Sequence, residues 1–178
     1  MRITHYIITL LLITVLTSSV PIDNVEVEEV IVSENIVGQQ AITIEYRDIP
    51  LDNDFQEFVI NQAKYMGVPE DIVFAVMEVE SGFNPNIISA TNDYGIMQIN
   101  KVNHAEMERL FGYDNMLDPY QNVVSGIYIL STLYDKYETD EEVLMAYNLG
   151  ESKAKEYWSR GIMRTKYVDK VVNTIETK

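Results

Sequence analysis

From Leu51 onward, apolar residues recur every three or four positions, the spacing of one face of an amphipathic helix. Capping residues and glycines divide this pattern into five helices, followed by two shorter ones. The expected helix starts are at Asp54, Pro69, Asn103, Asp118 and Thr139, and the expected stops are at Gly67, Gly82, Gly112 and Gly150. Tyr167 lies on the apolar stripe of the last helix. Residues 83–100 are the only stretch without a helical period. Residues 51–178 are therefore predicted to be one mainly α domain.

The first twenty residues have a different pattern. Arg2 precedes an uncharged apolar run over residues 6–16, which as a helix would span only about 16 Å, well short of a bilayer core. Small polar residues follow this run. Residues 1–20 are predicted to be a secretory signal peptide, and the alternative is an uncleaved N-terminal membrane anchor. Under either hypothesis the protein is exported, to the cell envelope or to the extracellular space.

Charge and composition exclude several classes of function. Residues 21–50 carry seven Asp or Glu against one Arg and are predicted to be an acidic linker. The whole chain has 13 Lys and Arg against 28 Asp and Glu, a net charge of −15, which argues against binding to nucleic acid. The chain has no Cys, only two His and no HExxH motif. We therefore expect no disulfide, no thiol chemistry, no metal site and no cofactor.

Glu80 is the most informative single residue. At 100° per residue its side chain lies about 20° from Val73 and 40° from Val76, so it points with them toward the apolar face of the second helix. Desolvation and the negative end of the helix dipole both act to raise the pKa of a carboxyl group there. A general acid that works near neutral pH requires such a pKa. A purely structural ion pair with Arg109 or Lys101 is the alternative interpretation.

Four short motifs follow one another around this residue. They are Glu80-Ser-Gly-Phe-Asn-Pro85, Ser89, Gly95-Ile-Met-Gln-Ile-Asn100 and Ala146-Tyr-Asn-Leu-Gly150. Together they resemble the catalytic domain of the soluble lytic transglycosylase family, enzymes that cut the glycan strands of peptidoglycan. The likeness covers roughly 110 residues, and four motifs in order are far more specific than one. The resemblance implies an all-α, lysozyme-like fold of the goose-lysozyme type.

Carried over position by position, the resemblance makes Glu80 the sole catalytic acid. It also implies a set of substrate-binding residues: Ser89, Met97, Gln98, Tyr147 and Asn148. The amides of Gln98 and Asn148 can both donate and accept hydrogen bonds, which suits acetamido and hydroxyl groups. Tyr147 can hydrogen-bond the acid or a sugar while its ring forms an apolar wall. Ordinary core packing is the alternative for Met97 and Tyr147.

The reaction implied by the resemblance needs one carboxyl group. Glu80 protonates the oxygen between N-acetylmuramic acid and the next N-acetylglucosamine. The C6 hydroxyl of the muramic acid then attacks the anomeric carbon and gives its proton to Glu80. The product is a 1,6-anhydro sugar, and no water is consumed.

Two other functions stay open. Asp93 precedes Tyr94-Gly95, and this segment also resembles animal-type lysozymes, in which an Asp at this place is the second catalytic carboxylate. A hydrolytic muramidase that uses Glu80 and Asp93 is therefore one alternative. A catalytically inactive cell-wall-binding domain on the same fold is the other.

The predicted binding partner is the peptidoglycan glycan strand. A membrane-spanning or secretion apparatus is a further candidate partner, and the protein is predicted to act as a monomer.

Overall fold

The computed structural model describes residues 45–177. The predicted signal peptide or anchor and most of the predicted acidic linker lie outside the described residues. The described chain forms seven α-helices, one 3-10 helix and a two-stranded sheet. In chain order these elements are α1 (Asn53–Met66), α2 (Glu70–Ser81), β1 (Asp93–Tyr94), β2 (Ile99–Asn100), η1 (Lys101–Asn103), α3 (His104–Phe111), α4 (Pro119–Tyr134), α5 (Asp140–Leu149), α6 (Glu151–Ser159) and α7 (Lys166–Glu176). The prediction of a mainly α domain is confirmed.

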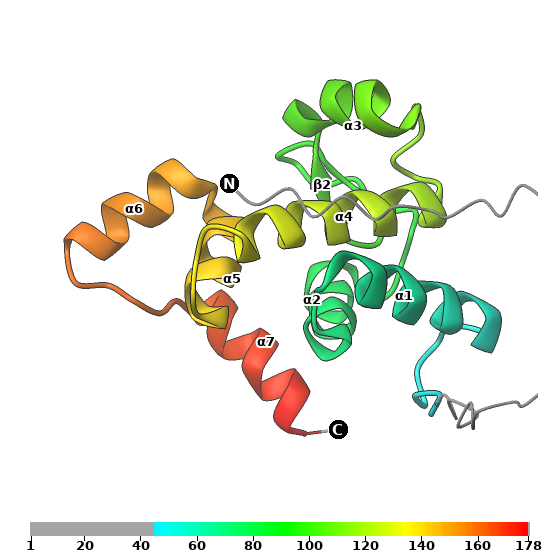
Figure 1. The fold of residues 1–178 in the computed structure, drawn as a ribbon, viewed down its shortest axis with the longest axis horizontal. Coiled ribbons are helices and arrows are strands. Elements are labelled where there is room, and N and C mark those ends of the chain that lie inside the picture. Colours follow the sequence, from blue (N-terminus) through cyan, green and yellow to red (C-terminus); the bar gives the residue numbers. More distant parts are fainter. Residues whose placement is uncertain (1–44, 178) are drawn as a thin grey trace, which may run out of the picture. The chain divides into compact units, whose positions relative to one another are not determined.

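The helices pack around α4, which runs through the middle of the unit (Figure 1). Helix α1 packs against α2 and α4, and α5 packs against α4. The chain then returns, so that the C-terminal helix α7 lies against α2 and α5, although α2 and α7 are far apart in sequence. This return brings the end of the chain next to the predicted catalytic helix. Among residues 45–177, no helix has the length and apolar character needed to cross a bilayer.

The helix starts follow the predicted chemistry with two differences. Helix α5 has the full capping box at Thr139. Helix α1, however, begins earlier than expected, because the side chain of Asp52 accepts a hydrogen bond from the Phe55 amide at 2.8 Å. Helix α3 begins after Asn103 as expected, but the Asn103 side chain makes no capping bond. Asn103 ends η1 with helical backbone angles, whereas a capping side chain requires an extended backbone.

The residues just before α1 are part of the packed unit rather than of a free linker. Gln56 is fully buried, and its side-chain amide donates to the carbonyl oxygens of Arg47 at 3.1 Å and Leu51 at 2.9 Å. The Gln56 side-chain oxygen accepts from the Arg47 amide at 2.8 Å. The Arg47 guanidinium lies 4.1 Å from the centre of the Phe74 ring in α2. The folded unit thus begins a few residues before Leu51.

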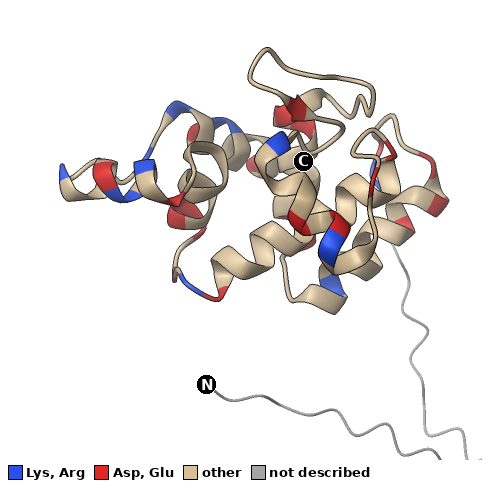
Figure 2. Ribbon diagram, turned by 90° about the horizontal axis from the view of Figure 1, so that it is seen from above, with Lys and Arg blue, Asp and Glu red and all other residues tan. Residues whose placement is uncertain are grey.

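Positive charge is concentrated at the C-terminal end of the described chain. Figure 2 shows Lys and Arg along α6 and on the chain that follows it. The residues are Lys153, Lys155, Arg160, Arg164, Lys166 and Lys170. The rest of the described chain has few cations, namely Arg47, Lys64, Lys101, Arg109 and Lys136. Lys and Arg are therefore sparse in the described chain before α6.

Candidate active site

A cavity of about 710 Å³ lies between the β-hairpin, η1, α3 and α4 and the C-terminal end of α5. Ligand-binding clefts commonly have volumes of this size. Of the residues predicted to form the site, five line this cavity: Glu80, Asp93, Gln98, Tyr147 and Asn148. The fold therefore brings together residues from α2, the hairpin and α5.

Glu80 occupies the last turn of α2. The helix ends there because Gly82 adopts a left-handed conformation with φ of 58°, and its N–H bonds back to the carbonyl of Glu78. The Ser81 hydroxyl donates to the Ile96 carbonyl at 2.7 Å. This bond ties the end of α2 to the loop that follows β1, so the position of Glu80 is fixed relative to the hairpin.

The Glu80 carboxyl group is mostly shielded from water, which raises its pKa from 4.5 to about 7. The Tyr167 hydroxyl donates to Glu80 Oε1 at 2.8 Å, and this bond partly opposes the rise. The negative charge of Asp93 adds to it. The upward shift predicted from the sequence is confirmed. The partner of Glu80 is a neutral hydroxyl, so the predicted alternative of an ion pair with Arg109 or Lys101 is wrong.

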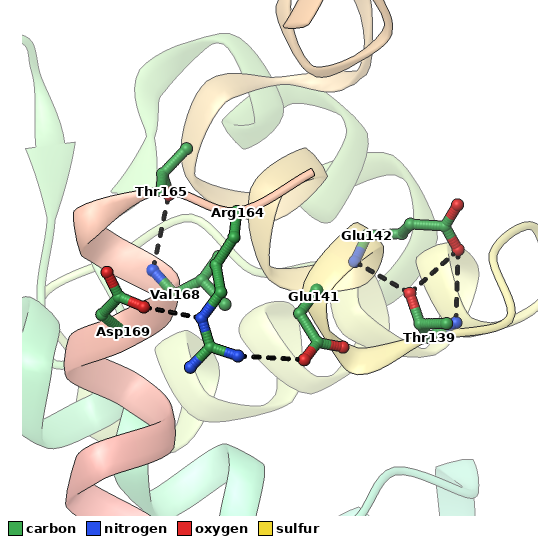
Figure 3. A network of polar contacts seen from close by, with 7 residues as sticks. All are labelled: Thr139, Glu141, Glu142, Arg164, Thr165, Val168 and Asp169. Atoms are coloured by element: carbon green, nitrogen blue, oxygen red, sulfur yellow. Dashed lines mark hydrogen bonds and ion pairs between the residues drawn. The ribbon is translucent and has the colours of Figure 1, made fainter. Parts of the chain in front are cut away.

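Tyr167 was not predicted to belong to the site, because the sequence places it on the apolar stripe of α7. Its contact with Glu80 depends on where α7 begins. Arg164 donates to Asp169 at 2.6 Å and to Glu141 at 3.2 Å, which links the start of α7 to α5 (Figure 3). The Thr165 side chain caps α7 by accepting from the amide of Val168. These contacts set the start of α7, and with it the place of Tyr167 beside Glu80.

Replacing Tyr167 with Phe is expected to raise the pKa of Glu80 above about 7, because the lost hydrogen bond stabilises the ionised carboxylate. An NMR titration of the Glu80 side-chain carboxyl carbon measures this directly. Tyr65→Phe is the matched control, since Tyr65 is 84% exposed. An unchanged Glu80 titration in the Tyr167→Phe protein would show that the hydroxyl does not act on the acid.

Asp93 is held by several donors on neighbouring residues. Its carboxylate accepts from Ser89 Oγ at 2.6 Å, from Asn100 Nδ2 at 2.6 Å and from the Thr91 hydroxyl. Although partial burial acts to raise the pKa of Asp93, the three hydrogen bonds together lower it. Asp93 is therefore ionised at neutral pH. Ser89, predicted to bind substrate, holds Asp93 through this hydrogen bond and is not among the residues that line the cavity.

Gln98 and Met97 are neighbours with different surroundings. Gln98 lines the cavity, and its side-chain amide donates to the carbonyl oxygens of Gly95 at 2.8 Å and Ile87 at 3.3 Å. The Met97 side chain is fully buried and packs against Gly126 of α4. The contact is so close that a Cβ atom added to Gly126 would lie 2.3 Å from the Met97 sulfur. The structure places Met97 in the core rather than in the cavity wall, as in the alternative interpretation of this residue.

Asn122 of α4 supports this loop and was not predicted from the sequence. Its side chain is fully buried and accepts from the Met97 amide at 2.8 Å while it donates to the carbonyl oxygens of Tyr94 at 2.7 Å and Met116 at 2.8 Å. Gly95 lies against it with φ of 75°, and a Cβ there would come within 2.5 Å of Asn122 Nδ2. No local motif marks Asn122, because its partners are 6 to 28 residues away in sequence.

Tyr147 and Asn148 form the wall of the cavity at the end of α5. The Tyr147 hydroxyl donates to the Met97 carbonyl at 2.9 Å, so it is committed to the loop rather than to Glu80. Asn148 is exposed. Within residues 45–177 no group of three His, Asp or Glu side chains converges in a way that could hold a metal ion.

The chain is similar to several known proteins. Residues 57–167 match the family model described as "Transglycosylase SLT domain". The chain is 35% identical over 88 residues to membrane-bound lytic murein transglycosylase C of Actinobacillus pleuropneumoniae serotype 5b, a match that covers 44% of this chain and 24% of that protein. It is 36% identical over 95 residues to protein IpgF of Shigella flexneri, which covers 49% of this chain and 62% of that protein.

Among solved structures, the lytic transglycosylase Slt of Pseudomonas aeruginosa has a similar fold. The TM-score is 0.58 at 20% sequence identity, over 71% of this chain and 23% of that one. The predicted lysozyme-like fold is confirmed. The chain thus matches only about a quarter of the length of Slt and of the Actinobacillus protein.

Proposed function

Because the chain belongs to the transglycosylase SLT domain family, we propose that it is a lytic transglycosylase that cleaves the glycan strands of peptidoglycan. The observation that carries this proposal is Glu80, whose pKa of about 7 leaves much of it protonated near neutral pH inside a cavity of about 710 Å³. A carboxyl group in this state can donate a proton to a glycosidic oxygen. An inactive wall-binding domain has no need for such a group.

One carboxyl group is enough for the proposed reaction. Glu80 gives its proton to the oxygen that links N-acetylmuramic acid to N-acetylglucosamine, and the bond from that oxygen to the anomeric carbon breaks. The C6 hydroxyl of the same muramic acid forms the new bond to the anomeric carbon and returns a proton to Glu80. Because this hydroxyl belongs to the substrate, it has the rate advantage of an intramolecular nucleophile and requires no activated water.

Asp93 bears on the choice between this reaction and hydrolysis. A hydrolase needs a second carboxylate, either as a base for water or as a nucleophile. Both oxygens of Asp93 accept hydrogen bonds, and its pKa is below the usual range, which makes it a weak base. Its place in the same cavity as Glu80 supports an electrostatic role near the positive charge that develops on the sugar. We therefore favour the transglycosylase and keep the muramidase as the second candidate.

Replacing Asp93 with Asn is expected to lower the rate of cleavage by no more than about tenfold, which corresponds to about 1.4 kcal/mol in the activation barrier. Removing the negative charge also lowers the pKa of Glu80, since Asp93 raises it. Cleavage requires protonated Glu80, so activity should decline at a lower pH than in the wild type. The measurement is the pH dependence of fragment release from peptidoglycan, with Asp114→Asn as an exposed control. A loss of several orders of magnitude would favour the muramidase.

The site of action follows from the substrate and from the relatives. One relative is named a membrane-bound murein enzyme, which supports a location in the cell envelope. Action as a monomer stays a prediction from the sequence. A membrane-spanning or secretion apparatus as partner stays a prediction from the sequence.

The proposal is tested by incubating the purified protein with insoluble peptidoglycan, without added metal or nucleotide, and measuring soluble glycan fragments. We expect release that depends on protein concentration and declines above about pH 7 as Glu80 ionises. Binding to the wall without release of fragments would contradict the enzymatic proposal and favour the inactive wall-binding domain.

A further inference from the structure

The cavity that Glu80 lines is also lined by a cation. Lys136, which follows the end of α4, lines the cavity together with Glu151 at the start of α6. Lys136 is the only Lys or Arg among the residues that line the cavity in the described chain. The acidic residues that line it are Glu80, Asp93, Glu106 and Glu151. Apart from Lys136, the charged side chains that line the cavity are therefore all acidic.

Lys136 pairs with the carboxylate of Glu151, which also has two other partners. Lys136 Nζ lies 2.6 Å from Glu151 Oε1, while the Tyr137 hydroxyl donates to Glu151 Oε2 at 2.9 Å and Lys155 Nζ lies 3.6 Å from that same oxygen. The hydrogen bonds from Lys136 and Tyr137 are the main reason why the pKa of Glu151 is lowered. Half of the Lys136 side chain is exposed. Lys136 can therefore turn toward a ligand in the cavity while Tyr137 and Lys155 still satisfy Glu151.

The proposed substrate has anionic groups only at defined places. The sugar rings of the glycan are uncharged, but the lactyl group of each muramic acid ends in a carboxylate or continues into a peptide that carries carboxylates. In a cavity that is otherwise acidic, such a carboxylate is repelled everywhere except near an ammonium group. Lys136 and Glu80 line the same cavity of about 710 Å³, so one bound strand can contact both.

We propose that Lys136 binds a carboxylate carried by a muramic acid unit of the strand and so sets which unit lies across Glu80. This inference rests on the proposed function, because it assigns a specificity role within the same site. Lys136 acts by binding and takes no part in proton transfer. Its effect falls on the affinity for substrate rather than on the chemical step.

The test is direct binding to the Glu80→Gln protein, in which cleavage does not interfere. Three ligands are compared: glycan strands that carry peptides, strands stripped of peptide by an amidase, and N-acetylglucosamine oligomers. The stripped strands have free lactyl carboxylates, the peptide-bearing strands have peptide carboxylates, and the oligomers have neither. Adding Lys136→Met should weaken binding of at least one kind of carboxylate-bearing strand about tenfold, which corresponds to about 1.4 kcal/mol. Binding of the oligomers should not change, and Lys136→Arg should keep most of the affinity.

Lys155→Met is the matched control, because Lys155 also pairs with Glu151 but does not line the cavity. A loss confined to stripped strands identifies the lactyl carboxylate, and a loss confined to peptide-bearing strands identifies the peptide. Equal weakening of all three ligands, no weakening of either strand, or the same loss in Lys155→Met would overturn the role of Lys136. If the Glu80→Gln protein with Lys136 intact binds none of the ligands, the proposed function itself is contradicted.

Discussion

Replacing Glu80 with Gln is expected to abolish glycan cleavage, with a loss of at least about a thousandfold in rate, while the protein stays folded. The amide keeps the shape of the side chain and can still accept from Tyr167, but it cannot give a proton to the leaving oxygen. The measurement is the release of soluble fragments from peptidoglycan. Glu106→Gln is the matched control, since Glu106 also lines the cavity and is half-exposed. Near-normal cleavage by a folded Glu80→Gln protein would refute the assignment.

The same substitution has a predicted effect on stability. The pKa of Glu80 in the folded protein is about 7, above the ordinary value of 4.5, so the native state binds this proton more tightly than the unfolded state does. The free energy of unfolding therefore decreases as the pH rises from about 4.5 to about 7, by up to about 3 kcal/mol. Glu80→Gln should remove this decrease. Urea unfolding at pH 4 and pH 8 measures the difference, and the variant should gain stability over the wild type only at the higher pH.

Replacing Asn122 with Leu is expected to lower the free energy of unfolding by about 4 kcal/mol. The substitution leaves three backbone groups without their partners, at Met97, Tyr94 and Met116. Each buried unsatisfied group costs about 1–3 kcal/mol, and new apolar contacts of Leu offset part of the sum. Urea unfolding measures the loss.

Asn61→Leu is the control for Asn122→Leu, because it makes the same change at an exposed position of α1. A loss below about 1 kcal/mol in Asn122→Leu would mean that the loop does not depend on these bonds. We expect the loop from Asp93 to Gln98 to lose its fixed geometry in this variant, so activity should fall together with stability.

The features that the sequence could predict are those set by local patterns. Apolar spacing and caps predicted the helices, and the capping box at Thr139 is present in full. The position of Glu80 on an apolar face predicted a raised pKa, because desolvation depends on which side of α2 the carboxyl group occupies. Most of these local predictions agreed with the structure, apart from the earlier start of α1 at Asp52 and the missing side-chain cap at Asn103.

The features that the sequence could not predict depend on distant contacts. Tyr167 lies 87 positions from Glu80, and its spacing along α7 fits an apolar stripe as well as it fits a catalytic neighbour. The hydrogen-bond partner of Tyr147 could not be predicted either, because its hydroxyl donates to the Met97 carbonyl, 50 positions away in sequence. The family resemblance placed both Met97 and Gln98 in the cavity wall. The backbone at Gln98 has φ of 51°, and only Gln98 lines the cavity, while Met97 is fully buried.

In the proposed reaction Glu80 acts alone, with the C6 hydroxyl of the substrate as the nucleophile. Mass spectrometry of the sugar ends released from purified peptidoglycan tests this claim most directly, because an anhydro end is lighter than a reducing end by one water. The proposed reaction predicts that the released muramic acid ends carry the 1,6-anhydro ring, in the wild type and in Asp93→Asn alike. Reducing ends as the main product would contradict it and would identify the protein as a hydrolase.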